Sequence, residues 1–273
     1  MKLLMWVVGA LVALVFVGWL GFQVRPAGFA PLRYPGRQPE TTTIPAGLPA
    51  PVERFLRATY GGDRIPVLST VVLSGRAAMR PAGPLYLPAR YRFVHNVGRD
   101  YRHYFEATWF GLPILTVDEG YVDGVSFFES PLVGSQADHP KLRQGANLAL
   151  WTEAMLFPAA LVLDPRVSWE AVDDHTAVLR VPFEDGRESV VVRFDPDTGL
   201  VTTMEAMRYR STSDAKKTLW IPSSDEYAVL GGATMAVACS ATWFDQKSAW
   251  ATFRVEEVVL NADLGDYLHA RGE

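Results

Sequence analysis

The stretch LLMWVVGALVALVFVGWLGFQV, residues 3–24, decides how this chain is organised. It contains no charged side chain, and Gln23 is its one strongly polar residue. About twenty apolar residues in a helix span the roughly 30 Å hydrocarbon core of a bilayer. A helix also satisfies its own backbone hydrogen bonds in hydrocarbon. We therefore predict that residues 1–24 form a transmembrane signal anchor that carries the rest of the chain.

The ends of this segment fit a membrane span. Trp6 and Trp19 lie where indole rings favour the membrane interface, and Gly9 and Gly18 would allow a neighbouring helix to approach closely. A cleaved signal peptide would have a shorter apolar run and a pair of small residues at its cleavage site. Residues 24–30, VRPAGFA, offer no good pair of this kind. The sequence thus favours an anchor that is retained.

The flanking charges leave the orientation open to two interpretations. Arg25, Arg33 and Arg37 follow the span and only Lys2 precedes it, so the positive-inside bias favours a cytoplasmic domain. A Met-Lys start with a very short tail instead resembles a secretory n-region, which places the domain outside. We adopt the second interpretation and expect a single-pass protein of the bacterial inner membrane with a periplasmic domain. The single Cys239 permits no intramolecular disulfide.

Composition limits the classes of function. Hydrophobic residues make up 49% of the chain and aromatic residues 12%, which predicts a well-packed core in one domain of about 225 residues after the anchor and linker. The net charge of -4 and the lack of a Lys/Arg cluster exclude a nucleic-acid binder. No nucleophile elbow, zinc-protease helix, glycine-rich phosphate loop or Cys-x-x-Cys pair occurs. We predict no enzyme activity, no metal and no cofactor.

Two segments precede the main domain. Residues 25–49 contain six prolines, so we predict an extended linker that either spaces the domain from the membrane or lies along a partner's surface. Residues 51–60, PVERFLRATY, have apolar side chains at helical spacing, and Gly61 and Gly62 follow them. This pattern predicts a short helix that ends at the glycines.

Period-two alternation dominates from residue 67 onward. In residues 85–93 the side chains of Leu87, Tyr91 and Phe93 face one way, while Arg90 and Arg92 face the other. Turn-forming residues separate successive runs, as expected for antiparallel neighbours. The pattern predicts eleven strands at residues 67–80, 85–96, 99–110, 114–129, 166–172, 176–183, 188–195, 200–211, 220–229, 233–244 and 250–261.

Residues 145–163, GANLALWTEAMLFPAALVL, interrupt the strands with an apolar helical run whose one charge is Glu153. A second membrane crossing is the alternative, but a carboxylate near mid-membrane costs about 2.5–3.5 kcal/mol. We predict a core helix that kinks or ends around Pro158. The fold class is therefore α+β and mainly antiparallel β, with a curved, partly closed sheet around one apolar helix in a domain of residues 50–263, and a polar tail at 264–273.

Three local patterns resemble a family of uncharacterised bacterial membrane-anchored proteins. They are LPAPVERFL at residues 48–56, EAMLFPAAL at 153–161 with Trp169-Glu170 after it, and ATWF at 241–244. This resemblance implies an architecture and no catalytic residue. More distantly, a sheet wrapped around a helix resembles the half-barrel of LolA-like lipoprotein carriers, whose concave face accommodates acyl chains.

Glu153 is the first candidate functional residue. An ionised carboxylate in an apolar helix must pair with a cation or take up a proton. We expect Glu153 to form a structural ion pair rather than to act as an acid/base or ligand-anchoring group. Its possible partners are Arg90, Arg92, Arg193 and Arg208.

Histidines and acidic turns are weaker candidates. His95 and His103 could face each other across the turn at Gly98, but two histidines without a third ligand do not make a metal site, so we interpret them as hydrogen-bonded sheet residues. Asp195 and Asp197 resemble the start of a calcium loop, yet the closing Glu is missing, and a hairpin turn is favoured.

Three functions remain in view. The first is a non-enzymatic accessory or scaffolding subunit of an inner-membrane complex, such as a respiratory or photosynthetic assembly. The second is a tethered domain that binds a lipid or another hydrophobic ligand such as an acyl chain. The third is an enzyme with Glu153 as acid/base. The expected partners are membrane lipid and other membrane-protein subunits, and the aromatic side chains that could contact a partner or ligand are Trp109, Phe110, Phe127, Phe128 and Trp151.

Overall fold

A computed structural model describes residues 2–33, 35–80, 83–131, 134–136 and 138–272. Its helices are α1 (Lys2–Gly21), α2 (Ala50–Tyr60), α3 (Pro140–Glu153) and α4 (Ala160–Leu163), with 3-10 turns η1 (Ala154–Leu156) and η2 (Gly265–His269). Its strands are β1 (Thr41–Thr43), β2 (Arg64–Pro66), β3 (Thr70–Met79), β4 (Leu87–Asn96), β5 (Asp100–Trp109), β6 (Leu112–Val122), β7 (Val125–Ser130), β8 (Gly134–Gln136), β9 (Ser168–Asp173), β10 (Thr176–Phe183), β11 (Gly186–Phe194), β12 (Val201–Arg208), β13 (Thr218–Leu230), β14 (Ala233–Trp243) and β15 (Ala251–Leu260).

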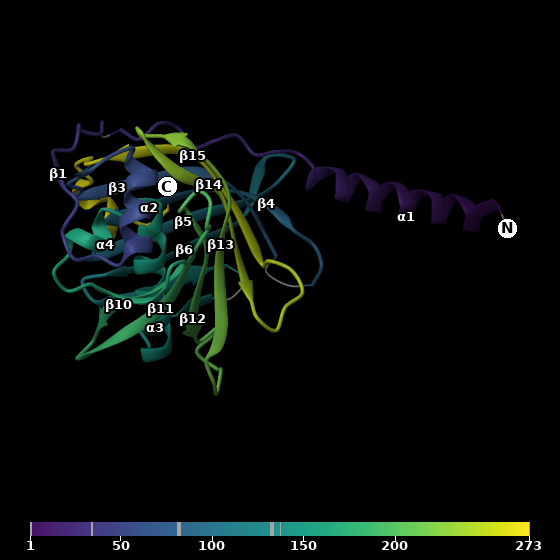
Figure 1. Cartoon of the computed structure of the whole chain (residues 1–273). Coiled ribbons are helices and arrows are strands. Elements are labelled where there is room, and N and C mark those ends of the chain that lie inside the picture. The colour runs from purple at the N-terminus through teal and green to yellow at the C-terminus, as the bar shows by residue number, and fades with distance from the viewer. Residues whose placement is uncertain (1, 34, 81–82, 132–133, 137, 273) are drawn as a thin grey trace.

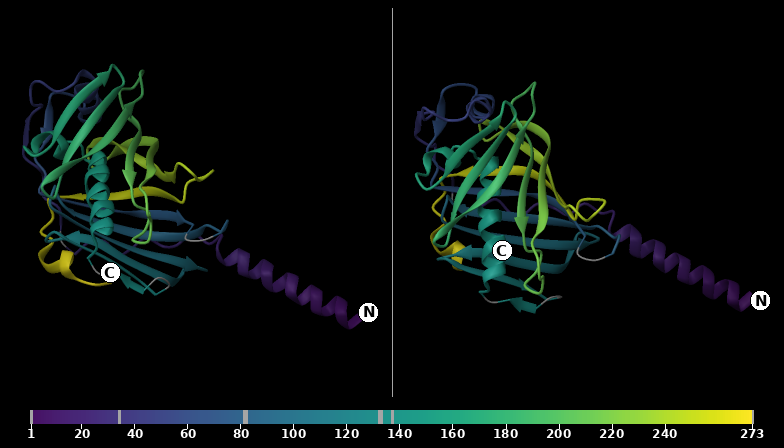
Figure 2. Two further views of the ribbon diagram at one scale, coloured as in Figure 1. Left: turned by 90° about the horizontal axis from the view of Figure 1, so that it is seen from below. Right: turned by 60° about the horizontal axis from the view of Figure 1, so that its bottom comes forward.

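One antiparallel sheet of thirteen described strands forms the body of the domain, in the order β8-β7-β6-β5-β4-β3-β15-β14-β13-β12-β11-β10-β9 (Figure 1). The sheet curves around α3 without closing (Figure 2). The predicted fold class is thus confirmed. The two additional strands have simple causes: the predicted strand at 114–129 is divided by a turn at Asp123 and Gly124, both with positive φ, and β8 is only three residues long.

The core lies between the concave face of the sheet and α3. Tyr91, Phe105 and Leu73 point inward and are buried, and α3 contributes Leu148 and Trp151, which are 0% and 1% exposed. His139 caps the start of α3 by accepting the Lys141 N–H, and Pro140 follows in the first turn. The apolar run around Glu153 is therefore a core helix, as predicted, and it ends before Pro158.

Helix α1 projects away from the domain (Figure 1), and within the described residues it is the one helix long and apolar enough to cross a membrane. Only Gly21 of α1 is buried. The tip of the β5–β6 hairpin fixes the end of the helix, because Trp109 Nε1 donates to Gly18 O at 2.9 Å and Phe110 N donates to Gly21 O at 2.8 Å. A Cβ at Gly21 would collide with the Trp109 ring, so only glycine fits there.

The proline-rich segment after α1, residues 25–33 and 35–37, forms a strap across the convex face of the chain's own sheet. Arg76 donates to the carbonyl of Pro26, and the Phe29 ring lies 4.4 Å from the Arg90 guanidinium. Further along, Arg37 N donates to Leu260 O at 2.9 Å. This placement on the chain's own sheet differs from both alternatives for the linker. The prolines keep the strap extended, and the sheet satisfies the carbonyl groups of the strap.

The convex face also holds residues near the C-terminus. Leu264 and Leu268 are buried against Val72 and Val94, and Arg102 donates to Tyr267 O at 3.1 Å. The two leucines explain why this segment of mostly polar sequence packs on the sheet.

Candidate functional site

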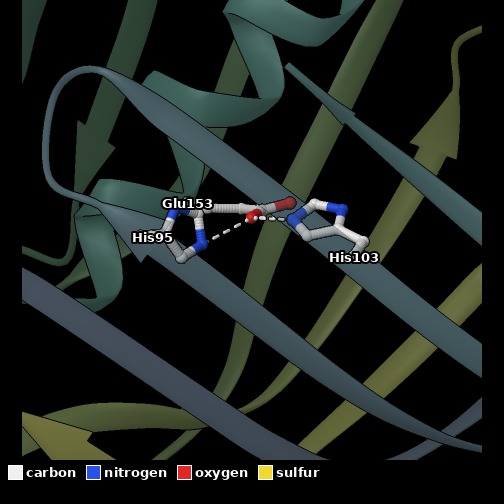
Figure 3. A group of neighbouring side chains, drawn as sticks. All are labelled: His95, His103 and Glu153. Carbon is white, nitrogen blue, oxygen red and sulfur yellow. Dashed lines mark hydrogen bonds and ion pairs between the residues drawn. The ribbon is translucent and has the colours of Figure 1, made fainter. Parts of the chain in front are cut away.

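Glu153, at the last residue of α3, meets two histidines of the sheet (Figure 3). His103 Nε2 lies 2.7 Å from Glu153 Oε2, and His95 Nε2 lies 3.1 Å from the same oxygen. The first contact is a hydrogen bond, and the second is a close polar contact without hydrogen-bond alignment. On its other side, His103 Nδ1 lies 3.1 Å from Glu119 Oε1. We call these four residues the inner cluster.

Strand alternation places the two histidines on the concave face. His95 shares the parity of Tyr91 and Phe93 in β4, and His103 pairs directly with Phe93 and Glu119 across β5. The His103 ring also stacks on Phe93 with centroids 3.9 Å apart. The hydrophobic core thus surrounds a polar cluster whose two histidines are at most 2% exposed.

Charges within the inner cluster are strongly coupled. Burial alone would raise the pKa of Glu153, but His103 and His95 outweigh burial and lower this pKa to about 2. Burial alone would lower the pKa of His103, but Glu153 and Glu119 together raise it to about 9. For His95 burial dominates, so its pKa is lowered. Near neutral pH, Glu153 is therefore ionised, His103 is protonated and His95 is neutral. The C-terminal end of α3 adds negative potential that favours the His103 cation.

The predicted arginine partners of Glu153 are wrong. Arg90 and Arg92 face the convex side, where Arg90 pairs with Glu106 and Arg92 donates to the strap carbonyl of Ala30. The two remaining candidates have other neighbours: Arg193 pairs with Glu205, and Arg208 lies over the Trp220 ring. The expected ion pair exists, but the imidazolium of His103 provides its positive side.

The same atoms resemble the donor set of a metal site. His95 Nε2, His103 Nε2 and a Glu153 oxygen all lie within 4.8 Å of one another. In the sequence, the two histidines and the acid stand out as separate candidates, and no local pattern brings them together. One signal could have identified His95 as a partner of Glu153. His95 has the same parity in β4 as Tyr91 and Phe93, so its side chain lies on the apolar face of the sheet.

Other predicted site residues are dispersed. Trp109 and Phe110, 37% and 42% exposed, form the hairpin tip beside α1, whereas Trp151 is buried in the core. Phe127 and Phe128 are half-buried on opposite faces of β7. The proposed membrane-interface residues Trp6 and Trp19 are exposed on α1, and a Cβ at Gly9 or Gly18 would meet nothing within 4 Å. Their roles remain predictions.

A pocket of about 570 Å³ opens where two strands of the sheet separate, and we call it the seam pocket. Strands β14 and β15 pair only between Ala238 and Ala241 of β14, so residues 233–237 of β14 and 255–260 of β15 diverge. The apolar part of the pocket lining comes from the end of β13, from β14 and β15, from α2, and from η1 with the residue that follows it: Tyr60, Leu156, Phe157, Leu230, Met235 and Val258.

Two exposed arginines stand at the seam pocket. Arg64 donates to the hydroxyl and the carbonyl of Thr41, and Arg37 lies on the strap. No carboxylate is among the described residues that line the pocket, so no lining acid neutralises these two arginines. Phe157 connects the pocket to the inner cluster, because its ring packs against His95 with centroids 5.2 Å apart.

A second pocket of about 510 Å³ lies where the strap leaves α1. Its arginines are neutralised: Arg25 and Arg76 both pair with Glu256, and Arg254 pairs with Glu226. Cys239 lines this pocket, and burial raises the pKa of its thiol to about 12, so the thiol stays protonated.

Comparison with known proteins places the sequence in a family. Residues 38–255 match a group described as a family of unknown function, DUF6544. The chain belongs to this family. The predicted resemblance to uncharacterised proteins is thereby confirmed. The description names no activity, so the absence of enzyme activity stays a prediction. No curated protein matches the sequence.

Solved structures with a related fold are distant. A DUF1329 family protein from Desulfovibrio piger is 11% identical, covers 75% of this chain and 91% of its own, and has a TM-score of 0.43. A LolA superfamily protein from Nitrosomonas europaea is 10% identical, covers 84% of this chain and 98% of its own, and has a TM-score of 0.44. Because both TM-scores are below 0.5, these likenesses carry no functional argument. Neither one names a multi-subunit assembly, so the scaffolding hypothesis gains no support.

Proposed function

We propose that this protein is a membrane-anchored binding domain for an anionic amphiphile, held in the seam pocket. The observation that carries the proposal is a pocket of about 570 Å³ whose lining combines apolar side chains with polar ones, among them two arginines and, within the described residues, no carboxylate. Pockets for small ligands commonly measure about 300–1,000 Å³ and combine an apolar lining with a few polar groups. This function corresponds to the second of the three hypotheses above.

The apolar body of the ligand would lie against Phe157, Met235 and Val258. Phe157 and Met235 are each 4% exposed, so they form the deeper wall, and the half-buried Val258 lies nearer the surface. Burying the ligand's hydrocarbon there would provide about 0.8 kcal/mol per CH₂ group. A carboxylate or phosphate head would then reach Arg37 and Arg64. Guanidinium groups bind both kinds of head in a bidentate manner.

Helix α1 would keep this domain at a membrane. We propose that it is retained as an anchor in a bacterial inner membrane with the domain on the periplasmic side. Exposure of nearly the whole apolar surface of α1 supports a lipid environment, because such a surface in water is highly unfavourable. Protease treatment of spheroplasts should digest the domain if it is periplasmic and should leave it intact if it is cytoplasmic.

Binding can be tested with the full-length chain in mild detergent. Palmitate and monopalmitoylglycerol have the same apolar chain, but only palmitate is charged, and lysophosphatidic acid replaces the carboxylate by a phosphate. We expect palmitate to bind at least about tenfold more tightly than the neutral glycerol ester, because a charge-assisted hydrogen bond is worth about 1.5–3 kcal/mol. The comparison with lysophosphatidic acid shows which head group is preferred.

Variants distinguish the contribution of the ligand's apolar body to binding from the contribution of its anionic head group. Arg37→Gln with Arg64→Gln should remove most of the preference for palmitate, and Met235→Trp should reduce binding of both lipids by filling the pocket. The matched control is Arg187→Gln, which removes an exposed arginine on β11 that hydrogen bonds to Ser168. Equal affinities of palmitate for the control and the double variant would contradict the head-group assignment. No binding of any of the three lipids would refute the function.

A further inference from the structure

The inner cluster has the geometry of three ligands around one point. His95 Nε2, His103 Nε2 and a Glu153 oxygen lie within 4.8 Å of one another, on two adjacent strands and the end of α3 (Figure 3). Ligand distances in zinc sites are about 2.0–2.2 Å for imidazole nitrogen and carboxylate oxygen. Donor atoms separated by roughly 3–4 Å can therefore share one ion after small side-chain movements.

The outer contacts of His103 also suit a metal ligand. Its Nδ1 lies 3.1 Å from Glu119 Oε1, so that carboxylate can hold the Nδ1 proton while Nε2, 2.7 Å from Glu153 Oε2, gives up its own proton to bind an ion. Histidine ligands of metals almost always donate their other ring N–H to a carboxylate, a carbonyl or water, which fixes the tautomer. Glu119 is in position for this role because it pairs directly with His103 across β5 and β6.

His95 provides an independent indication of a ligand. It is completely buried; among the described residues its Nδ1 has no hydrogen-bond partner, and its Nε2 has only the 3.1 Å contact with Glu153 Oε2, which lacks hydrogen-bond alignment. A buried polar group without a partner costs about 1–3 kcal/mol. An ion bound at Nε2, the nitrogen nearer Glu153, would satisfy that nitrogen in a core that is otherwise well packed.

Charge in the inner cluster points to a cation. Glu153 and Glu119 bring two carboxylates to the histidines, and in the described part of the chain neither acid forms an ion pair with an arginine or lysine. A divalent cation would balance both carboxylates, and it would take the position of the proton between His103 and Glu153.

We propose that His95, His103 and Glu153 bind one divalent transition-metal ion of the Zn²⁺ class, with Glu119 as the outer partner of His103. Two imidazoles and one carboxylate are typical of zinc and related ions, whereas Ca²⁺ and Mg²⁺ prefer sites made only of oxygen. The ion would join the end of α3 to strands β4 and β5, so it would hold the core helix against the sheet.

The test uses the full-length chain in mild detergent, stripped with EDTA and dialysed. Zn²⁺ is titrated by calorimetry, bound metal is counted by mass spectrometry, and Co²⁺ provides a visible absorption spectrum that reports its ligands. We expect one equivalent of Zn²⁺ and a Co²⁺ spectrum of nitrogen and oxygen ligation. Glu153→Gln and His103→Asn should each weaken Zn²⁺ binding at least 100-fold, because a neutral amide replaces a ligand.

Two further variants keep the test decisive if a ligand variant fails to fold. Glu119→Gln retains all three ligands and should weaken Zn²⁺ binding about 10–100-fold, the usual effect of losing an outer partner. The control His175→Asn changes an exposed loop histidine and should bind Zn²⁺ as the wild type does. If folded wild-type protein takes up no Zn²⁺ or Co²⁺, or if Glu119→Gln and Glu153→Gln bind both ions normally, the proposal is wrong.

Discussion

Strands β4, β5 and β6 carry ionisable side chains on both faces, but the two faces use different chemistry. The concave face holds the inner cluster, in which imidazoles contact carboxylates. The convex face holds arginine pairs: Arg90 with Glu106, Arg102 with Asp118, and on the adjoining strands Arg76 with Glu256. An imidazole can lose its proton or bind a metal, whereas a guanidinium remains charged. The charge of the inner cluster can therefore change through proton loss or metal binding. The convex pairs provide fixed charges that hold the strap and the C-terminal residues.

The largest effect is expected at Arg102, which is 0% exposed and makes a bidentate contact with Asp118 at 3.0 and 2.8 Å. Arg102→Met should destabilise the domain by about 3–5 kcal/mol, because it leaves the Asp118 carboxylate buried without its cation. Urea denaturation followed by circular dichroism measures this change. The double variant Arg102→Met with Asp118→Leu should recover most of the loss. A single-variant loss below about 1 kcal/mol would show that the convex charges are not fixed in the way we describe.

A smaller effect is expected at Glu153. With EDTA present, Glu153→Gln should cost about 1–2 kcal/mol, since the amide retains a hydrogen bond and His103 keeps its contact with Glu119. The same denaturation experiment compares it with the Arg102 variant. If Glu153→Gln destabilises the domain more than Arg102→Met does, the proposed difference between the changeable charges of the inner cluster and the fixed arginine pairs of the convex face is wrong.

The next largest effect on stability is expected from a substitution in the strap. Phe29 lies 4.4 Å from the Arg90 guanidinium and 5.2 Å from that of Arg92. Phe29→Ala should lower stability by about 1–2 kcal/mol, because two cation–π contacts and some apolar burial are lost. Limited proteolysis should then cleave the strap faster. Phe244→Ala removes a ring that is 73% exposed and serves as the control. Identical cleavage of the two variants would indicate that Phe29 does not hold the strap.

The smallest effect is expected at the hairpin tip. Trp109→Phe removes the 2.9 Å hydrogen bond to Gly18 O but keeps an aromatic ring. Because Trp109 is 37% exposed, the loss should stay below about 1 kcal/mol, and domain unfolding should hardly change. Hydrogen exchange at the last turn of α1 should become faster. Unchanged exchange there would mean that the indole does not stabilise the end of the helix.

Much of the fold could be predicted from local sequence pattern. Alternation identified the long strands, and Gly61, with φ of 71°, ends α2 as expected. Short elements were missed: β1, β2 and β8 have three residues each, too few for a period to be visible. The strap was predicted as an extended linker, but nothing local indicates that arginines of β3 and β4 donate hydrogen bonds to its carbonyl groups.

The inner cluster shows why the site was harder to predict than the fold. Alternation already placed Arg90 and Arg92 opposite Tyr91 and Phe93, so they could not reach a helix on the apolar face. His95 shares the apolar parity and was the better candidate partner for Glu153. The contact itself depends on how α3 lies within the curved sheet, across 50 residues of sequence from His103 to Glu153. Such placement is a property of the whole sheet and not of any local motif.

The hydrogen bonds from the hairpin tip to α1 determine how the domain would stand on a bilayer. The hydrogen bonds to Gly18 O and Gly21 O restrain the angle between the domain and the end of α1. Leu112 and Ile114, 67% and 52% exposed, follow the hairpin tip on β6 and would lie near lipid head groups if α1 spans a bilayer as proposed. Strand β1, whose Thr41 lines the seam pocket, lies at the end of the domain away from α1 (Figure 1). With α1 in a bilayer as proposed, an amphiphile in the seam pocket would consequently exchange with the aqueous space above the membrane rather than with the adjacent lipid leaflet.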